Sequence, residues 1–150
     1  MITLRDITAD NWHACIDLEV MPGQEHFVAS NVYSLAQAGV QPECVPRAVY
    51  CDDTMIGFLM YEFDPANGDW WIFRLMIDRR YQGRGLGRAT LLEAIRYLRL
   101  QRPDAGVSIT LHPDNEQARH LYLSVGFEET GTRVADEDVL SLPARAAAEL

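Results

Sequence analysis

The residues best suited to chemistry lie in one glycine-rich segment, Arg79–Arg88, which reads RRYQGRGLGR. Its three glycines occupy alternate positions, so the backbone can turn tightly and approach a bound group without obstruction by Cβ atoms. A strand-like run, Trp70–Ile77, precedes the segment, and a helix-like run, Ala89–Leu100, follows it. The unpaired N–H groups and the positive dipole end of such a helix attract anions. The segment therefore predicts a phosphate-binding turn.

The distribution of charge supports this interpretation. The chain carries a net charge of −9, yet residues 79–102 hold seven arginines and one glutamate. Four of these arginines crowd the start of the predicted helix, where the dipole disfavours cations: Arg79, Arg80, Arg84 and Arg88. A polyanionic ligand removes the conflict. The alternatives are a turn that only packs and a solvated, arginine-rich helix face.

Two common phosphate-binding motifs do not fit the segment. A P-loop requires a Gly-Lys-Ser/Thr ending, and the chain contains no lysine. A dinucleotide-binding turn requires a third glycine where Arg88 stands. The spacing that remains is Gln82-x-x-Gly85-x-Gly87.

Composition excludes several other classes of protein. An isoelectric point near 4.8 argues against generic nucleic-acid binding. No apolar run approaches the ~20 residues that span a membrane, and the N-terminus lacks the features of a signal peptide. Three cysteines without a Cys-x-x-Cys spacing favour reduced thiols, and hence a cytoplasmic protein. The four histidines show no metal-ligand spacing, so no metal is expected.

The elements that must position the turn follow from apolar periodicity and turn residues. We expect one domain over residues 1–150, an α/β fold with a mixed sheet in the order β-α-α-β-β-β-α-β-α-β-β. The predicted strands are 2–7, 47–51, 55–63, 70–77, 107–111, 127–134 and 138–142. The predicted helices run from Thr8 or Asp10 to about Val20, and over 24–38, 89–100 and 114–125, the last opened by Asp114 and Gln117. Residues 143–150 are expected to form a frayed tail or a short helix.

A second motif follows the turn by about 30 residues. Residues 115–127 read NEQARHLYLSVGF, which fits Asn-x-x-Ala-x-x-Leu-Tyr-x-x-x-Gly-Phe. Helical spacing places Ala118, Leu121, Tyr122 and Val125 on one apolar face. A purely structural role in the core is therefore the alternative to a functional role for Tyr122. Together and in this order, the two motifs resemble those of the GNAT superfamily of N-acetyltransferases. The resemblance covers residues 2 to about 142. Within the superfamily, the sequence is most similar to bacterial spermine/spermidine (diamine) acetyltransferases.

The resemblance implies an acetyl-CoA-dependent N-acetyltransferase without a metal, acting by direct attack of a small primary amine on the thioester. A polyamine is the first expectation; an aminoglycoside, amino acid or protein N-terminus is the alternative, as is a non-catalytic acyl-CoA sensor. It further implies that backbone amides of the turn hold the CoA pyrophosphate, that main-chain groups of the preceding strand pair with the pantetheine, and that Asn115 bonds the pantetheine arm. Tyr122 would protonate the leaving thiolate. The implied cofactor-binding residues are Leu75, Met76, Ile77, Gln82, Gly83, Arg84, Gly85, Leu86, Gly87, Arg88 and Asn115. A homodimer is compatible with the superfamily.

One departure from the family concerns the general base. Polyamine-acetylating relatives carry a carboxylate on the strand before the turn, and the matching position here is Phe73. Glu62, on the neighbouring strand, or water could take the proton instead, although a solvated Glu62 is the alternative. Glu19 and Glu25 lie where the family's acceptor loop would be, and could bind a substrate cation or be ordinary surface residues. Trp70 and Trp71 either line the acceptor side or pack the hairpin.

Overall fold

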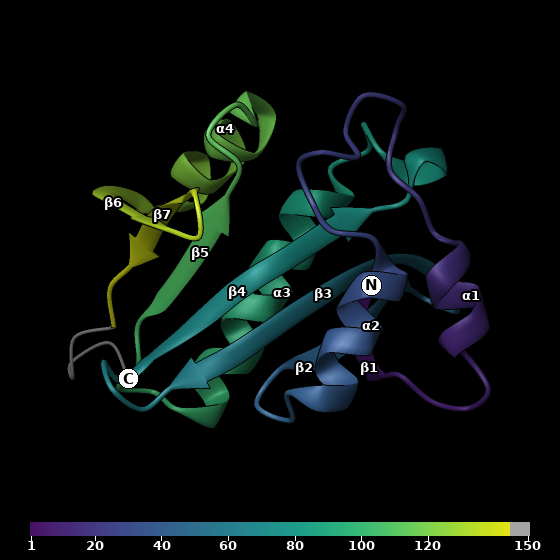
Figure 1. Ribbon diagram of the computed structural model, residues 1–150, viewed down its shortest axis with the longest axis horizontal. Coiled ribbons are helices and arrows are strands. Elements are labelled where there is room, and N and C mark those ends of the chain that lie inside the picture. The colour runs from purple at the N-terminus through teal and green to yellow at the C-terminus, as the bar shows by residue number, and fades with distance from the viewer. Residues whose placement is uncertain (145–150) are drawn as a thin grey trace.

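The computed structural model describes residues 1–144, which form seven strands, four α-helices and one 3₁₀ helix (Figure 1). The strands are β1 (Ile2–Asp6), β2 (Val45–Cys51), β3 (Thr54–Asp64), β4 (Asp69–Ile77), β5 (Val107–Leu111), β6 (Glu128–Val134) and β7 (Glu137–Leu142). The α-helices are α1 (Trp12–Asp17), α2 (Asn31–Val40), α3 (Leu86–Gln101) and α4 (Glu116–Val125); the 3₁₀ helix is η1 (Arg79–Tyr81). The predicted order of elements is confirmed, whereas most of the tail predicted over 143–150 lies outside the described residues. None of the helices in residues 1–144 is long and apolar enough to cross a membrane.

All seven strands form one sheet in the order β1-β2-β3-β4-β5-β7-β6. The first four strands make an antiparallel meander because short turns join β2 to β3 and β3 to β4. The α3 crossover makes β5 parallel to β4, and the last hairpin inserts β7 between β5 and β6. The predicted mixed sheet is therefore confirmed.

β4 and β5 pair over a short stretch only and then separate, which leaves a gap at the centre of the sheet. Only Trp70–Ile72 pair with Val107–Ile109, whereas β3 accompanies β4 as far as Ile77. From Phe73 onward, the edge of β4 that faces β5 has no strand partner among the described residues. Backbone N–H and C=O groups on this edge must find partners elsewhere, which suits an extended ligand.

Helices cover both faces of the sheet (Figure 1). On one face, Leu91, Ala94 and Leu98 of α3 pack with Leu59 and other buried residues of the central strands, and α4 joins the same cluster. On the opposite face, residues of α1, α2 and the segment between them pack on Phe58 and Met60. Burial of these apolar faces drives the assembly of the sheet with its helices.

The two N-terminal helices are shorter than predicted. α1 ends at Asp17, and α2 begins only at Asn31, where the Ser30 hydroxyl accepts a hydrogen bond from the Tyr33 N–H and caps the helix. Residues 18–30 instead form turns whose polar groups bond to the glycine-rich turn and whose rings pack across the molecule. Tertiary contacts thus override the helical periodicity, as they often do for short segments.

The starts of the two later helices also differ from expectation. α3 begins at Leu86, three residues before the predicted run, because Gly85 takes a left-handed conformation and acts as its N-cap. α4 is capped by Asn115, whose side-chain oxygen accepts from the Ala118 N–H at 3.2 Å, and not by Asp114. Asn and Asp are about equally good N-cap residues, so the sequence alone does not distinguish the two positions.

Candidate active site

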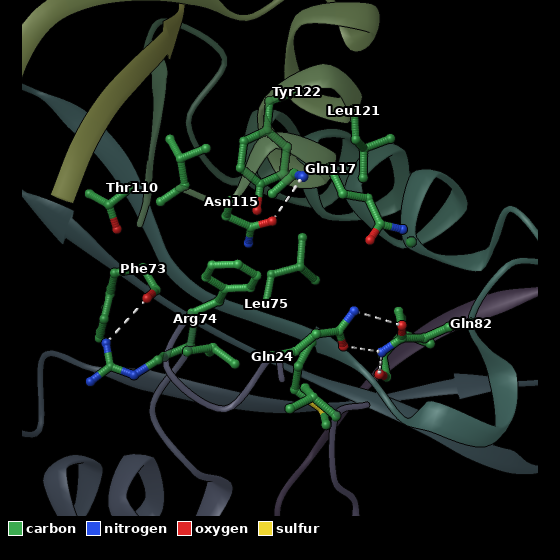
Figure 2. Close-up of a pocket in the computed structure, with 18 of the residues that line it drawn as sticks. Gln24, Phe73, Arg74, Leu75, Gln82, Thr110, Asn115, Gln117, Leu121 and Tyr122 are labelled. Atoms are coloured by element: carbon green, nitrogen blue, oxygen red, sulfur yellow. Dashed lines mark hydrogen bonds between the residues drawn. The ribbon is translucent and has the colours of Figure 1, made fainter. Parts of the chain in front are cut away.

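A cavity of about 820 Å³ lies where β4 and β5 part (Figure 2). Its walls come from the C-terminal part of β4, the glycine-rich turn, α4, the segment between α1 and α2, and the start of β7. Most residues that the sequence assigned to a site line this one cavity: Glu25, Leu75, Met76, Ile77, Gln82, Gly83, Gly85, Leu86, Gly87, Arg88, Asn115 and Tyr122. The cavity is large enough for a cofactor arm and a small acceptor.

The glycine-rich turn forms one end of the cavity. Gly83 and Gly85 have φ values of 78° and 77°, a region that residues with a Cβ rarely occupy. α3 starts directly after them, so the N–H groups of its first turn have no acceptors within the helix. The Gln82 side chain donates to the Ile77 carbonyl and is paired with Gln24 across the cavity end (Figure 2). The turn is therefore held open and presents bare amides to the cavity.

The arginines around the turn do not all face a ligand. Arg79 pairs with Glu19 at 3.2 Å, and Arg80 pairs with the buried carboxylate of Asp78 at 2.8 Å. Arg84 donates to the Arg80 carbonyl and does not line the cavity. Only Arg88 both lines the cavity and reaches α4, where it donates to the Ser124 hydroxyl. Protein carboxylates therefore balance two of the four arginines that the sequence had attributed to a polyanion. The backbone amides of the turn are then the main groups available to bind an anion.

We expect Gly85→Ala to weaken CoA binding. At φ 77° an alanine is strained by roughly 1–2 kcal/mol, and its methyl group would occupy open space at the end of the cavity that the glycine-rich turn forms. The measurement is the dissociation constant for CoA by calorimetry. Gly131→Ala is the matched control, because Gly131 has a similar φ of 75° and open surroundings but lies outside the cavity. Equal CoA affinity in both variants would contradict the assignment of the turn.

Asp78 ties the glycine-rich turn to the segment after α1. Its side chain is 2% exposed. One carboxylate oxygen accepts from the Glu19 N–H at 3.1 Å, and the other accepts from the backbone N–H and the guanidinium of Arg80. Burial alone would raise the pKa of Asp78, but the hydrogen bonds from Arg80 and Glu19 outweigh it and hold the pKa below its usual value. The ionised form is therefore the one that the fold requires.

Asp78→Asn should lower the free energy of unfolding by about 1.5–3 kcal/mol at neutral pH, because an amide cannot accept all three bonds. The folded-state pKa is depressed, so the stability due to the carboxylate is complete above the ordinary value of 3.8 and disappears as pH falls through the lower folded value. Melting temperatures of both proteins across acidic and neutral pH test this. A difference that stays constant down to the most acidic pH would contradict it.

α4 brings Tyr122 and Asn115 to the cavity from above β4 (Figure 2). Tyr122 is 5% exposed and points its hydroxyl toward the space beside Asn115 and over Leu75. Burial, followed by the negative charge of Glu137, raises the pKa of Tyr122 well above its usual value. The phenol is consequently protonated at neutral pH and can donate a proton. Asn115 uses its oxygen to cap α4, which leaves its NH₂ group for a ligand.

Other residues named from the sequence lie elsewhere. Glu62 of β3 lies next to Glu43 and Cys44 and does not line the cavity. Burial and then the charges of Glu43 and Asp64 raise its pKa. Glu19 is engaged with Arg79 outside the cavity. Trp70 packs edge-on against Tyr61 and Phe63, and neither Trp70 nor Trp71 lines the cavity.

The structure adds cavity residues that the sequence reasoning missed: His26, Phe27, Tyr33, Arg74, Thr110 and Glu137. Arg74 donates to Gln37 and to the Phe73 carbonyl. Glu137 comes from the last hairpin, whose insertion beside β5 is a long-range feature. The available signal was an acidic residue directly before the predicted strand 138–142, which the structure extends to begin at Glu137.

Comparison with known proteins agrees with this geometry. The structure of an N-acetyltransferase from Thermoplasma acidophilum in complex with coenzyme A matches with a TM-score of 0.71 and 16% identity, over 95% of this chain and 99% of that one. The structure of spermidine N-acetyltransferase from Vibrio cholerae in complex with CoA and spermine matches with a TM-score of 0.69 and 18% identity, over 93% and 92% of the two chains. The mixed sheet and its helices thus define an acetyltransferase fold.

Sequence comparison identifies the family. The model of the acetyltransferase (GNAT) family matches residues 8–127. The spermine/spermidine N(1)-acetyltransferase of Bacillus subtilis (strain 168) is 31% identical over 136 residues, which cover 87% of this chain and 90% of that protein. The chain belongs to the GNAT family of acetyltransferases and is an N-acetyltransferase of the acyltransferase class.

Proposed function

We propose that the protein transfers the acetyl group of acetyl-CoA to a primary amine of a small molecule, with spermidine and spermine as the first candidates. The observation that carries the choice of acceptor is the 31% identity to a spermine/spermidine N(1)-acetyltransferase across almost the whole of both chains. Two carboxylates, Glu25 and Glu137, line the cavity and suit a cationic acceptor.

In this proposal, the first-turn amides of α3 and the Arg88 guanidinium bind the pyrophosphate. The pantetheine lies along the free edge of β4, next to Leu75, Met76 and Ile77, and bonds to the backbone there and to the Asn115 NH₂ group. The acetyl thioester then lies under the Tyr122 hydroxyl. Tyr122 protonates the thiolate as the tetrahedral intermediate collapses.

A second candidate acceptor carries a carboxylate beside its amine, as an amino acid does. Arg74 favours it, because its guanidinium lines the cavity and could pair with that carboxylate. Spermidine has no group for such a pair.

The test is release of CoA thiol by the purified protein with acetyl-CoA and a panel of amines. Turnover with spermidine or spermine above that with amino acids and aminoglycosides supports the first candidate; preference for an amino acid supports the second. Absence of transfer to every amine, together with a CoA-dependent rise in melting temperature, would indicate an acyl-CoA sensor and contradict the proposal. At 100 times the dissociation constant, CoA should add about 2.7 kcal/mol of stability, which a melting curve detects.

A further inference from the structure

Glu137 enters the cavity through the geometry of the last hairpin. Ala135 and Asp136, with φ values of 50° and 66°, form the tight turn between β6 and β7, and Glu137 is the first residue after it. The next residue, Asp138, points to the other face of the sheet, where it forms ion pairs with Arg119 of α4 and with Arg133. Because side chains alternate along a strand, these ion pairs direct Glu137 toward the cavity.

The position of Glu137 is reinforced by the neighbouring strand. β7 pairs with β5 through Thr110↔Val139 and Leu111↔Asp138. Since Val139 is two residues after Glu137 on β7, its partner Thr110 lies on the same face of the sheet as Glu137. Arg119, only 17% exposed, also binds Glu129 of β6, and thereby holds the whole hairpin against α4.

The buried hydroxyl of Thr110 lies beside Glu137. The Thr110 hydroxyl oxygen is buried and makes no well-formed hydrogen bond with any residue in the described part of the chain. It lies close enough to Glu137 to favour its charged form. The hydroxyl oxygen and the carboxylate both keep free acceptor capacity, so these two groups that line the cavity suit a ligand with N–H donors.

Four groups on other elements act on or respond to the charge of Glu137. Burial raises its pKa most strongly; Thr110, Arg74 of β4 and His112 act in the opposite direction, and burial prevails. Tyr122 of α4 responds, since the charge of Glu137 raises the phenol's pKa. The acid and the carboxylate therefore interact across the cavity. A raised pKa brings the carboxylate closer to the pKa of an ammonium group, so the carboxylate accepts a proton from that group more readily.

We propose that Glu137 is the residue that accepts a proton from the acceptor's ammonium group, with Thr110 as a second hydrogen-bonding partner of the nitrogen. This inference rests on the proposed function. The base then lies on β7; Phe73 of β4 lines the cavity but cannot accept a proton, and Glu62 lies outside the cavity.

Glu137 takes one proton from the ammonium, and the free amine adds to the thioester carbonyl to form a C–N bond. The C–S bond then breaks, and the thiolate receives the Tyr122 proton. Tyr122 regains a proton from the substrate nitrogen, which leaves a neutral amide. Glu137 releases its proton to solvent, so one proton appears per acetyl group transferred.

The experiment compares Glu137→Gln with Asp136→Asn across the pH range. Gln removes the carboxylate in the cavity, and kcat/KM for the amine should fall about 10²-fold near pH 7. The loss should shrink as pH approaches the pKa of the amine, because the free amine then forms in solution. Asp136→Asn removes the same charge from an exposed neighbour in a left-handed conformation that Asn tolerates. It should leave kcat/KM unchanged, and CoA should stabilise both variants.

A second variant does not depend on the folding of the first. Thr110→Val keeps the side-chain shape and removes the hydroxyl that lowers the pKa of Glu137. The acid limb of kcat/KM against pH should therefore move to higher pH. An unmoved limb, or equal activity of Glu137→Gln and the control, would overturn the role of Glu137. So would a uniform loss at every pH that accompanies a lower melting temperature. If the wild type transfers acetyl to no amine, the proposed function fails and this role fails with it.

Discussion

Tyr122→Phe should abolish most of the turnover and leave CoA binding intact. The change removes only the hydroxyl, because Phe keeps the apolar ring contacts that Tyr122 makes beside Phe127. Loss of a positioned general acid costs about 10²–10⁴-fold in rate. The raised pKa of Tyr122 keeps the phenol protonated throughout neutral and mildly alkaline pH, so wild-type kcat should not fall there through tyrosine ionisation.

Steady-state kcat and the CoA-dependent melting shift measure this prediction. Tyr50→Phe is the control, since Tyr50 lies on β2 outside the cavity and loses the same hydroxyl. Undiminished kcat in the Tyr122 variant would show that the thiolate leaves without its help. The residue would then be one of the buried apolar side chains of α4.

Gly57→Ala should be the most damaging small substitution for stability. Gly57, near the start of β3, pairs with Ile77 at the end of β4, and an added Cβ would lie 2.4 Å from the Met76 carbonyl oxygen and 3.4 Å from the Ile77 Cα. Both atoms belong to the backbone, so the strands themselves would have to separate. Overpacking of this kind costs about 1–3 kcal/mol or more. The displaced segment of β4 is also a cavity wall, so CoA affinity should decrease with stability.

Urea unfolding and CoA titration of the Gly57 variant test both parts. Gly39→Ala is the control, because Gly39 lies within α2 and an added Cβ meets nothing within 4 Å. Alanine in a helix interior is favoured over glycine, so the control should gain about 0.5–1 kcal/mol. Equal stability changes at the two positions would show that β3 and β4 tolerate the extra atom.

The sequence predicts the parts of the site that depend on local rules. Gly83 and Gly85 indicate a tight turn, and both have positive φ in the structure. The amphipathic pattern around Tyr122 predicts that α4 packs against the sheet, as it does. Short turns give the meander of β2, β3 and β4, and an intervening helix makes β5 parallel to β4. Each of these inferences needs only neighbours along the chain, which explains why the fold class was accessible from one sequence.

The parts that could not be predicted depend on long-range contacts. Nothing near Glu137 in sequence indicates that β7 will insert beside β5, which is what brings this carboxylate to the cavity. The partner of Arg79, Glu19, is also distant in sequence. Arg80 pairs with Asp78 only two residues away, but its charge too is balanced by the protein, so a count of charges overstated what remains for a ligand. The predicted start of α2 at residue 24 was wrong for a related reason. Residues 24–30 make contacts across the cavity in place of helical hydrogen bonds.

The bonds between the two loops at the end of the cavity have a consequence for how the reaction proceeds. Gln24 and Gln82 exchange two hydrogen bonds at 3.0 and 3.2 Å. Glu19 is held as well: its N–H donates to the Asp78 carboxylate, its carbonyl accepts from the Arg79 N–H, and its carboxylate pairs with the Arg79 guanidinium. A cofactor that shifts one loop must therefore move the other or break these bonds. If the proposed donor contacts one loop and the proposed acceptor the other, their affinities are thermodynamically linked, and each alters the other by the same factor. We accordingly expect the amine's affinity to depend on which form of the cofactor is already bound.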